Sequence, residues 1–121
     1  MTIQKIPEIF SVCKVKDYSL TDFTQKYCFT ENTDEENSLV CATAFVPENV
    51  TDREDGWRAF RIRGELDFSL VGILARIAGL LAEAEISIFA VSTYNTDYVF
   101  IKEENYDRAL DALAADGFDI C

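Results

Sequence analysis

The residues that decide the fold run from Gly64 to Lys102, GELDFSLVGILARIAGLLAEAEISIFAVSTYNTDYVFIK. Their pattern predicts the end of a strand, a polar loop, an amphipathic helix, a strand, a polar turn and a further strand. The apolar residues of the predicted helix recur at the spacing of one helical face: Ile73, Leu74, Ile77, Leu80, Leu81 and Ala84. Ile86–Val91 is an apolar run short enough for a buried strand, and Tyr98–Lys102 forms the next strand after the turn Ser92–Asp97.

The residues on either side of this stretch extend the pattern. Trp57–Leu66 alternates between apolar and polar residues, as a strand does when one of its faces is buried. Asn105–Asp116 predicts a second amphipathic helix that Gly117 is placed to end, and Phe118–Ile120 leaves room for one short strand. From Trp57 onward the order is β-α-β-β-α-β, which predicts an α+β, ferredoxin-like fold with its helices on one face of an antiparallel sheet.

The residues before Trp57 are expected to form strands with little helix. Apolar runs predict three strands there: Glu8–Val15, Cys28–Thr33 and Leu39–Val46. Leu20–Tyr27 fits one or two helical turns, whereas Glu48–Gly56, ENVTDREDG, has almost no apolar residue and is expected to be a linker. This organisation is compatible with a shortened copy of the same unit. We therefore expect an abbreviated subdomain with a linker over residues 1–56 and a complete domain over residues 57–121.

The composition is that of a globular protein with a strong negative charge. The chain has 121 residues, of which 49% are hydrophobic and 27% charged, and its net charge is −11. This charge argues against nucleic acid and anionic membrane surfaces as partners, because both are bound through Lys and Arg. The negative charge is explained either by solubility or by attraction of a cationic ligand or a basic partner. No apolar run is long enough to span a bilayer and no signal peptide is recognisable, so the expected location is the cytoplasm.

The cysteines and the missing histidines argue against a metal site and against His-based catalysis. The four cysteines are widely spaced and the chain has no His; they are Cys13, Cys28, Cys41 and Cys121. A structural zinc site needs closely spaced Cys or His ligands, so we expect buried, reduced thiols instead. Without His, the triads of hydrolases and the commonest general base are excluded. We expect no metal, no cofactor and no catalytic residue.

Three arginines raise the question of phosphate chemistry, which some ferredoxin-like proteins perform. They are Arg61, Arg63 and Arg76. An enzyme of that kind needs an Arg in a loop that cradles the phosphate, and the predicted loop between Leu66 and the helix has neither an Arg nor a Gly-rich segment. The arginines therefore receive no catalytic role.

Two segments resemble a known family. Gly64–Asn105, the stretch quoted above continued by EEN, resembles the second half of small proteins with paired ACT domains, and Thr33–Cys41, TDEENSLVC, resembles their first half. Similar ACT units occur in the regulatory part of aspartate kinases and in the cytosolic arginine sensor of animal cells. The resemblance implies tandem ACT-like subdomains, the first abbreviated, that bind amino acids at interfaces between ACT units and pair into dimers. It implies a regulatory protein rather than an enzyme.

The first candidate site is the loop that opens the predicted helix. It comprises Asp67, Phe68, Ser69, Leu70, Val71, Gly72 and Ile73. Backbone N–H groups at a helix start suit a carboxylate, Gly72 permits close approach of a ligand, and Asp67 could meet an ammonium group. The resemblance implies that this loop holds the α-amino and α-carboxyl groups of the ligand. The alternative is that Asp67 or Ser69 only caps the helix.

The second candidate site is the turn after the strand Ile86–Val91. It comprises Thr93, Tyr94, Asn95, Thr96 and Asp97, preceded by Ser92. A tight turn needs one or two polar residues, and this segment has more than it needs. The resemblance to the arginine sensor implies that this segment lines the pocket and that Asp97 favours a basic or polar ligand. The alternative is an ordinary turn.

Together these expectations favour non-catalytic binding of a small amino acid or related metabolite, in a homodimer, at an interface between ACT units. The competing hypothesis is a ligand-free module for dimerisation or protein interaction. A closed polar cavity favours the first hypothesis, and a flat exposed apolar patch favours the second.

Overall fold

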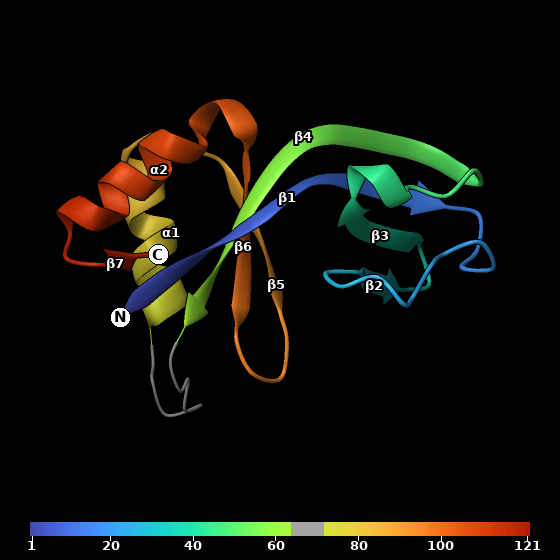
Figure 1. Ribbon diagram of the computed structural model, residues 1–121, viewed down its shortest axis with the longest axis horizontal. Helices are drawn as coiled ribbons and strands as arrows, with labels where there is room; N and C mark the ends of the chain where they lie inside the picture. Colours follow the sequence, from blue (N-terminus) through green and yellow to red (C-terminus); the bar gives the residue numbers. More distant parts are fainter. Residues whose placement is uncertain (64–71) are drawn as a thin grey trace. The chain divides into compact units, whose positions relative to one another are not determined.

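The computed structural model describes residues 1–63 and 72–121, and every structural statement below concerns these residues. They form an α+β fold (Figure 1). Its elements, in chain order, are β1 (Thr2–Val15), β2 (Phe29–Asn32), β3 (Asn37–Ala42), the 3-10 helix η1 (Thr43–Phe45), β4 (Val50–Arg63), α1 (Ile73–Glu83), β5 (Ile88–Ser92), β6 (Asp97–Lys102), α2 (Glu103–Ala115) and β7 (Asp119–Ile120).

The chain divides into two compact units. The helical unit consists of Met1–Pro7 and Arg58–Cys121, and the strand unit consists of Glu8–Trp57. The strands β1 and β4 each contribute residues to both units. The change of unit within β4 lies one residue from the boundary expected from the sequence, but the first seven residues belong with the C-terminal part. That the strand unit is an abbreviated ACT-like subdomain stays a prediction.

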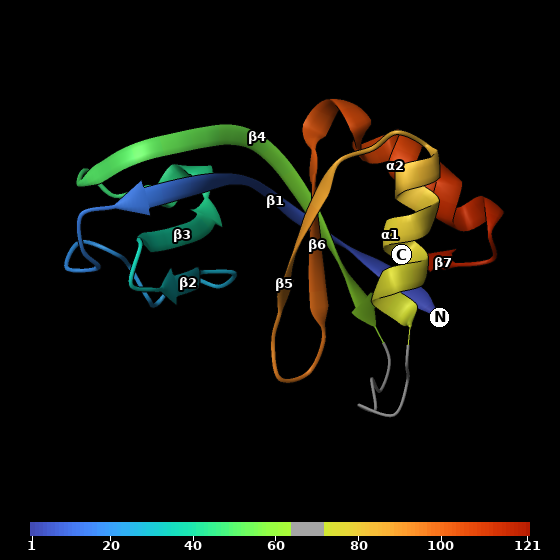
Figure 2. The same ribbon diagram turned by 180° about the vertical axis from the view of Figure 1, so that it is seen from behind.

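The sheet of the helical unit has the strand order β7-β1-β4-β6-β5, and both helices lie on one of its faces (Figures 1 and 2). The elements from β4 to β7 follow the predicted β-α-β-β-α-β order, which confirms the ferredoxin-like fold. The start of β1 lies between β4 and β7, where the sequence alone indicates no strand. It pairs in parallel with β7, and Thr2 lies opposite Asp119.

The core of the helical unit lies between its sheet and its helices. The predicted apolar face of α1 is confirmed, because Ile77 and Leu81 are fully buried and the other members of that face pack around them. The sheet contributes alternate residues, since side chains of a strand point to opposite faces. The buried residues are Ile3, Phe60, Ile62, Ile77, Leu81, Ile86, Val99, Ile101, Tyr106, Ala109, Leu110, Leu113 and Phe118.

Tyr106 connects α2 to the sheet through a buried hydrogen bond, in which its hydroxyl donates to the backbone oxygen of Ala59 at 2.6 Å. Tyr106→Phe is expected to lower the free energy of unfolding by about 1–3 kcal/mol, because the buried carbonyl loses this donor. Urea unfolding followed by circular dichroism measures the change. Tyr94→Phe removes the same atom from a side chain that is 86% exposed, and is expected to stay within about 0.5 kcal/mol. Equal effects of the two variants would contradict the assigned role.

The strand unit is built on the order β2-β3-β1-β4. The first three strands are antiparallel neighbours, with Cys13 opposite Leu39 in β1 and β3. A small apolar core buries Cys13, Val15, Leu39 and Cys41, which confirms the expected buried thiols at Cys13 and Cys41. All four cysteines are free, and Cys121 is exposed.

Two element predictions in the strand unit are wrong. Leu20–Tyr27 forms turns instead of a helix, because Asp22 accepts hydrogen bonds from both the backbone N–H and the hydroxyl of Thr24. Such local side-chain bonds compete with helical ones. The strand predicted to reach Val46 ends at Ala42 and continues as η1.

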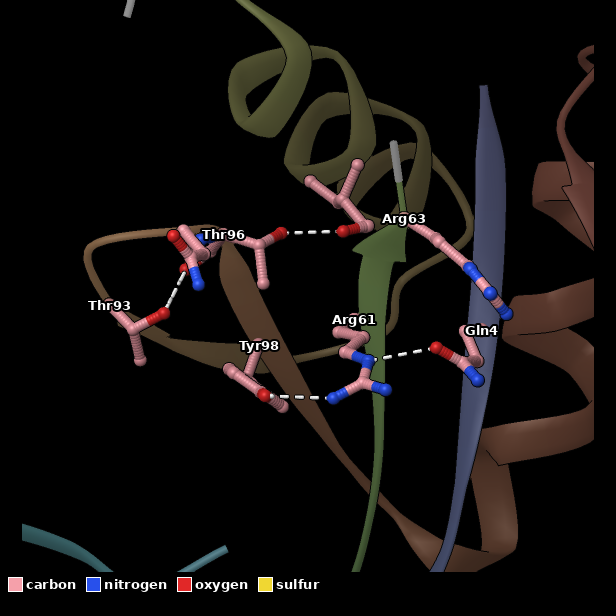
Figure 3. A pocket seen from close by; sticks show the side chains of 8 residues that line it. Gln4, Arg61, Arg63, Thr93, Thr96 and Tyr98 are labelled. Carbon is pink, nitrogen blue, oxygen red and sulfur yellow. Dashed lines mark hydrogen bonds between the residues drawn. The ribbon is translucent and has the colours of Figure 1, made fainter. Parts of the chain in front are cut away.

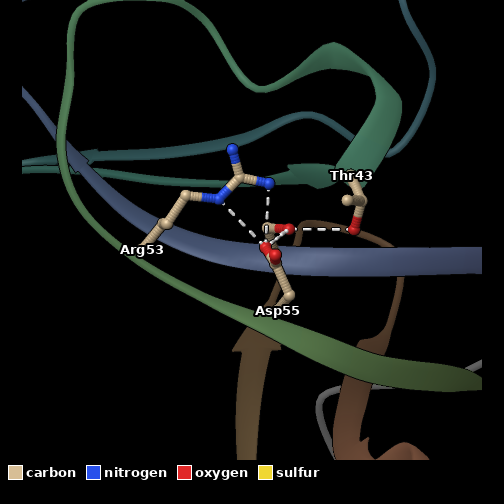
Figure 4. Close-up of polar contacts among 4 residues, drawn as sticks. Thr43, Arg53 and Asp55 are labelled. Carbon is tan, nitrogen blue, oxygen red and sulfur yellow. Dashed lines mark hydrogen bonds and ion pairs between the residues drawn. The ribbon is translucent and has the colours of Figure 1, made fainter.

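The prediction of a linker over Glu48–Gly56 is also wrong, because β4 begins at Val50. Its polar residues find partners across the strand unit, as Figure 4 shows. The fully buried hydroxyl of Ser11 donates to Asp55, and it accepts from Thr43 at 2.8 Å because its single proton is used. Arg53 donates two hydrogen bonds to the same carboxylate oxygen. The strand therefore needs no apolar face there to pair with β1.

Candidate functional site

A polar pocket of about 340 Å³ opens on the helical unit (Figure 3). It is formed by the ends of neighbouring strands and by the turn between β5 and β6. The lining residues are Gln4, Arg61, Ile62, Arg63, Thr93, Asn95, Thr96 and Tyr98. The volume lies at the lower end of the range of about 300–1,000 Å³ that is typical of small-molecule sites.

The pocket lies on the face of the sheet that the helices leave uncovered. Ile62 and Val99 bury their side chains in the core beneath the helices. Because neighbouring side chains of a strand point to opposite faces, Arg61 and Arg63 project together from the other face of β4. Figure 3 shows the Arg63 side chain extending from β4 toward β1 and the Arg61 guanidinium lying between Tyr98 and Gln4.

Arg61 is held in place by two neutral groups. Its Nε donates to Oε1 of Gln4 at 2.8 Å, and its Nη1 donates to the hydroxyl of Tyr98 at 3.1 Å. These bonds join side chains from β1, β4 and β6. These partners therefore position the guanidinium without supplying a counter-charge, since neither is a carboxylate.

The turn between β5 and β6 is fixed to the floor of the pocket. The backbone N–H and the hydroxyl of Thr93 both donate to the backbone oxygen of Thr96, at 2.8 Å and 2.9 Å. The hydroxyl of Thr96 donates to the backbone oxygen of Ile62. This cross-strand bond holds the turn against β4, so the wall that the turn forms is preorganised.

Part of the predicted turn site lines the pocket. Thr93, Asn95 and Thr96 line it, and Figure 3 shows Thr93 and Thr96 in the turn. Tyr94 is 86% exposed and is not among the lining residues. Asp97 is not among them either, and its carboxylate accepts a hydrogen bond from the hydroxyl of Ser92. A ligand contact by Tyr94 or Asp97 stays a prediction.

The predicted loop site falls largely outside the described residues, which exclude Asp67, Phe68, Ser69, Leu70 and Val71. Gly72 and Ile73 are described. Gly72 occupies the N-cap position of α1 with φ of 90°, a left-handed conformation that favours glycine, and Ile73 is the first residue of the helix. Their contact with a ligand stays a prediction.

Five lining residues were not predicted as site residues: Gln4, Arg61, Ile62, Arg63 and Tyr98. The spacing of Arg61 and Arg63 is a signal in the sequence, because residues two apart on a strand share a face. Tyr98 follows the polar turn directly. No local pattern indicates Gln4, since it reaches the pocket only through the pairing of β1 with β4.

The described part of the lining is positively charged in a strongly negative chain. Among residues 1–63 and 72–121, the lining contains two arginines and no Asp or Glu, whereas the net charge of the protein is −11. Among the residues that the structure describes, no group of three metal-ligating side chains is found. None of the helices in that part of the chain is long and apolar enough to cross a bilayer.

Comparison with known sequences gives one family and one group of relatives. The family model described as ACT domain matches residues 52–115. The protein named cytosolic arginine sensor for mTORC1 subunit 1 is 41% identical over 58 residues in both Homo sapiens and Bos taurus. The matched segment is 47% of this chain and only 18% of those proteins, so the chain spans less than a fifth of the relatives it matches.

Comparison with solved structures gives the same fold. A crystal structure of a protein from Agobacterium tumefaciens superimposes with a TM-score of 0.88 at 22% identity, over 99% of this chain and 91% of that one. The ligand-free regulatory subunit of aspartate kinase from Thermus thermophilus gives a TM-score of 0.64 at 10% identity, over 95% and 96% of the two chains. At these identities the likeness concerns the fold alone.

Proposed function

Because this chain belongs to the ACT domain family, we propose that it is a non-catalytic regulatory protein that binds a small amino acid or a related metabolite. The observation that carries the proposal is the pocket of about 340 Å³ in the helical unit. Three residues of the predicted turn site line it, and its size suits a free amino acid better than a peptide or a nucleotide.

The names of the relatives support a role in amino-acid sensing. One relative is an arginine sensor, and a structural neighbour is a regulatory subunit of aspartate kinase. The matched part of the arginine sensor is only 18% of that protein, so its ligand is not transferred to this chain. The ligand is therefore proposed only by class, and its charge has to be inferred from the residues that line the pocket.

The proposed mechanism is the stabilisation of one assembly of ACT units. We propose that the chain acts as a cytoplasmic homodimer, with the ligand bound where ACT units of the two copies meet. The turn from Thr93 to Thr96 is already fixed by its own hydrogen bonds, so binding would cost it little further ordering. A ligand can shift such an equilibrium only by its difference in affinity for the two states.

The alternative, a ligand-free interaction module, is favoured by a different observation. The strand unit exposes large apolar side chains: Ile9 at 45%, Leu20 at 55%, Phe23 at 61% and Phe45 at 43%. Under this alternative they would contact a protein partner and the pocket would take no ligand.

Thermal unfolding of the full chain, measured with each of the twenty amino acids and common small metabolites, tests the proposed function. A ligand present at about 100 times its dissociation constant is expected to add about 2.7 kcal/mol of stability, and hence several degrees to Tm. Asn95→Ala should reduce the shift, because this exposed side chain lines the pocket.

Asn32→Ala is the matched control, because it removes an exposed amide from β2 in the strand unit. It should keep the full shift. A panel without any shift, together with an unchanged oligomeric state in light scattering, would overturn the ligand-binding proposal in favour of the interaction module.

A further inference from the structure

Two positively charged side chains lie together in the pocket. Arg61 and Arg63 both line it, and none of the other lining residues that the structure describes is acidic. We propose that the pocket selects a small anion, whose carboxylate or phosphate group is held by Arg61 and Arg63. This inference rests on the proposed function and adds to it the charge of the ligand and the residues that read it.

Two other arginines of this negative chain form ion pairs with aspartates. Arg53 pairs with Asp55 at 2.9 Å, and Arg76 pairs with Asp116. Within residues 1–63 and 72–121, no such ion pair involves Arg61 or Arg63. The chain contains 22 Asp and Glu residues, and none of those in the described part of the chain lines the pocket.

The donors of Arg61 are oriented, and within the described residues they are only partly used. A guanidinium carries five N–H groups, and in Arg61 one on Nε and one on Nη1 are taken by Gln4 and Tyr98. The remaining N–H groups belong to a half-buried side chain whose position is already set. An anion that meets them would not have to immobilise the arginine first, which favours affinity.

Arg63 supplies the second charge at the rim of the pocket. Its side chain is exposed, and it follows Arg61 by two residues on the same face of β4. Arginine binds planar carboxylates and phosphates through paired hydrogen bonds, which a lysine cannot reproduce. Amide groups of Gln4 and Asn95 lie in the same lining and can donate to oxygens of the ligand.

The same charges disfavour a cationic ligand in this pocket. A basic side chain would meet two guanidinium groups, and the lining residues that the structure describes offer it no carboxylate. The role predicted for Asp97, attraction of a basic ligand, therefore competes directly with the role proposed here for Arg61 and Arg63. The two predict ligands of opposite charge, so one experiment separates them.

Isothermal titration calorimetry of the full chain with four probes tests the inference. The probes are L-glutamate, succinate, inorganic phosphate and L-arginine. At least one anionic probe is expected to bind, more weakly at high than at low salt, and L-arginine is not. Binding of L-glutamate or succinate identifies a carboxylate ligand, and binding of phosphate alone identifies a phosphorylated one.

Arg63→Gln is expected to weaken binding of that anionic probe by roughly ten- to a hundredfold, and Arg63→Lys should restore only part of the loss. Arg63 is exposed, so neither variant should change the circular dichroism spectrum or Tm. Lys14→Gln is the matched control, because it removes one positive charge from an exposed residue of the strand unit and should leave binding unchanged.

The outcomes separate this inference from the proposed function. Binding of L-arginine or a neutral amino acid that survives Arg63→Gln and Arg61→Gln would overturn the anion proposal and leave ligand binding intact. A lack of binding by every probe, together with no thermal shift in the panel of amino acids, would overturn both. If Lys14→Gln weakens anion binding as much as Arg63→Gln does, the loss reflects the net charge of the protein. That result would overturn the assignment of the anion to the pocket.

Discussion

Phe60→Ala is expected to lower the free energy of unfolding by about 3–5 kcal/mol, a large part of the 5–15 kcal/mol that stabilises a typical domain. Phe60 is fully buried near the C-terminal end of β4 and belongs to the same core cluster as Ile77 and Leu81 of α1. Removing its ring withdraws apolar surface from the core and leaves a cavity that the flanking strands cannot easily close. Urea unfolding, followed by the far-ultraviolet circular dichroism of the full chain, measures the loss.

Phe23→Ala provides the matched control for this prediction. It removes the same ring from the strand unit, where Phe23 is 61% exposed and touches Tyr18 edge-on. Its effect should stay near 0.5 kcal/mol, as expected for a surface substitution. A loss below about 1 kcal/mol in Phe60→Ala, or a similar loss in both variants, would show that the core is not packed as described.

Alkaline pH is expected to destabilise the protein strongly through its buried thiols. Burial raises the pKa of the Cys41 thiol from 9.0 to about 12, and burial also raises the pKa of Cys13 and Cys28. Between these two values the unfolded chain releases the Cys41 proton while the folded chain keeps it, so stability falls as the pH rises above 9. From pH 8 to pH 11, Cys41 alone should account for roughly 2–3 kcal/mol.

Urea unfolding at pH 8, 9, 10 and 11, in the presence of a reducing agent, measures this dependence. Cys41→Ala is expected to flatten the decline with pH, whatever it does to the stability at pH 8. Cys121→Ala removes an exposed thiol and should keep the steep decline of the unmodified chain. If the free energy of unfolding falls equally steeply with pH in the two variants, burial of Cys41 does not determine the loss of stability at alkaline pH.

The elements of the helical unit are predictable because local pattern and tertiary role agree in them. The apolar face expected over Ile73–Ala84 is the face that α1 buries, and the helix ends at Glu83. The hairpin of β5 and β6 also follows the expected apolar runs around a polar turn. Here periodicity alone determines which side chains meet the core.

The strand unit is less predictable because backbone pairing there replaces apolar pattern. The first half of β4 is polar, and it forms a strand through its pairing with β1 and the contact of Asp55 with Ser11. No rule based on hydrophobicity indicates that pairing. Leu20–Tyr27 is apolar enough for a helix, but Asp22 and Thr24 satisfy their polar groups in a turn.

Residues of the candidate site are predictable only where they lie in one continuous segment of the sequence. The polar excess of the turn points to Thr93, Asn95 and Thr96, all of which line the pocket. Gln4 is brought to Arg61 by the insertion of β1 between β4 and β7, a contact across 57 positions of sequence. This strand order depends on the whole fold, and no local sequence pattern around Gln4 indicates it.

The pairing of the first strand with the last also sets the order in which the protein folds as it is synthesised. The strand unit consists of consecutive residues, so all its strands have been synthesised before α1. The sheet of the helical unit cannot be completed until Asp119 reaches Thr2, and closing so long a loop is slow. Until α1 and α2 pack on it, the apolar face of β4 around Phe60 has no cover. The nascent chain is therefore most exposed to chaperones, and to aggregation, at the residues that later form its core.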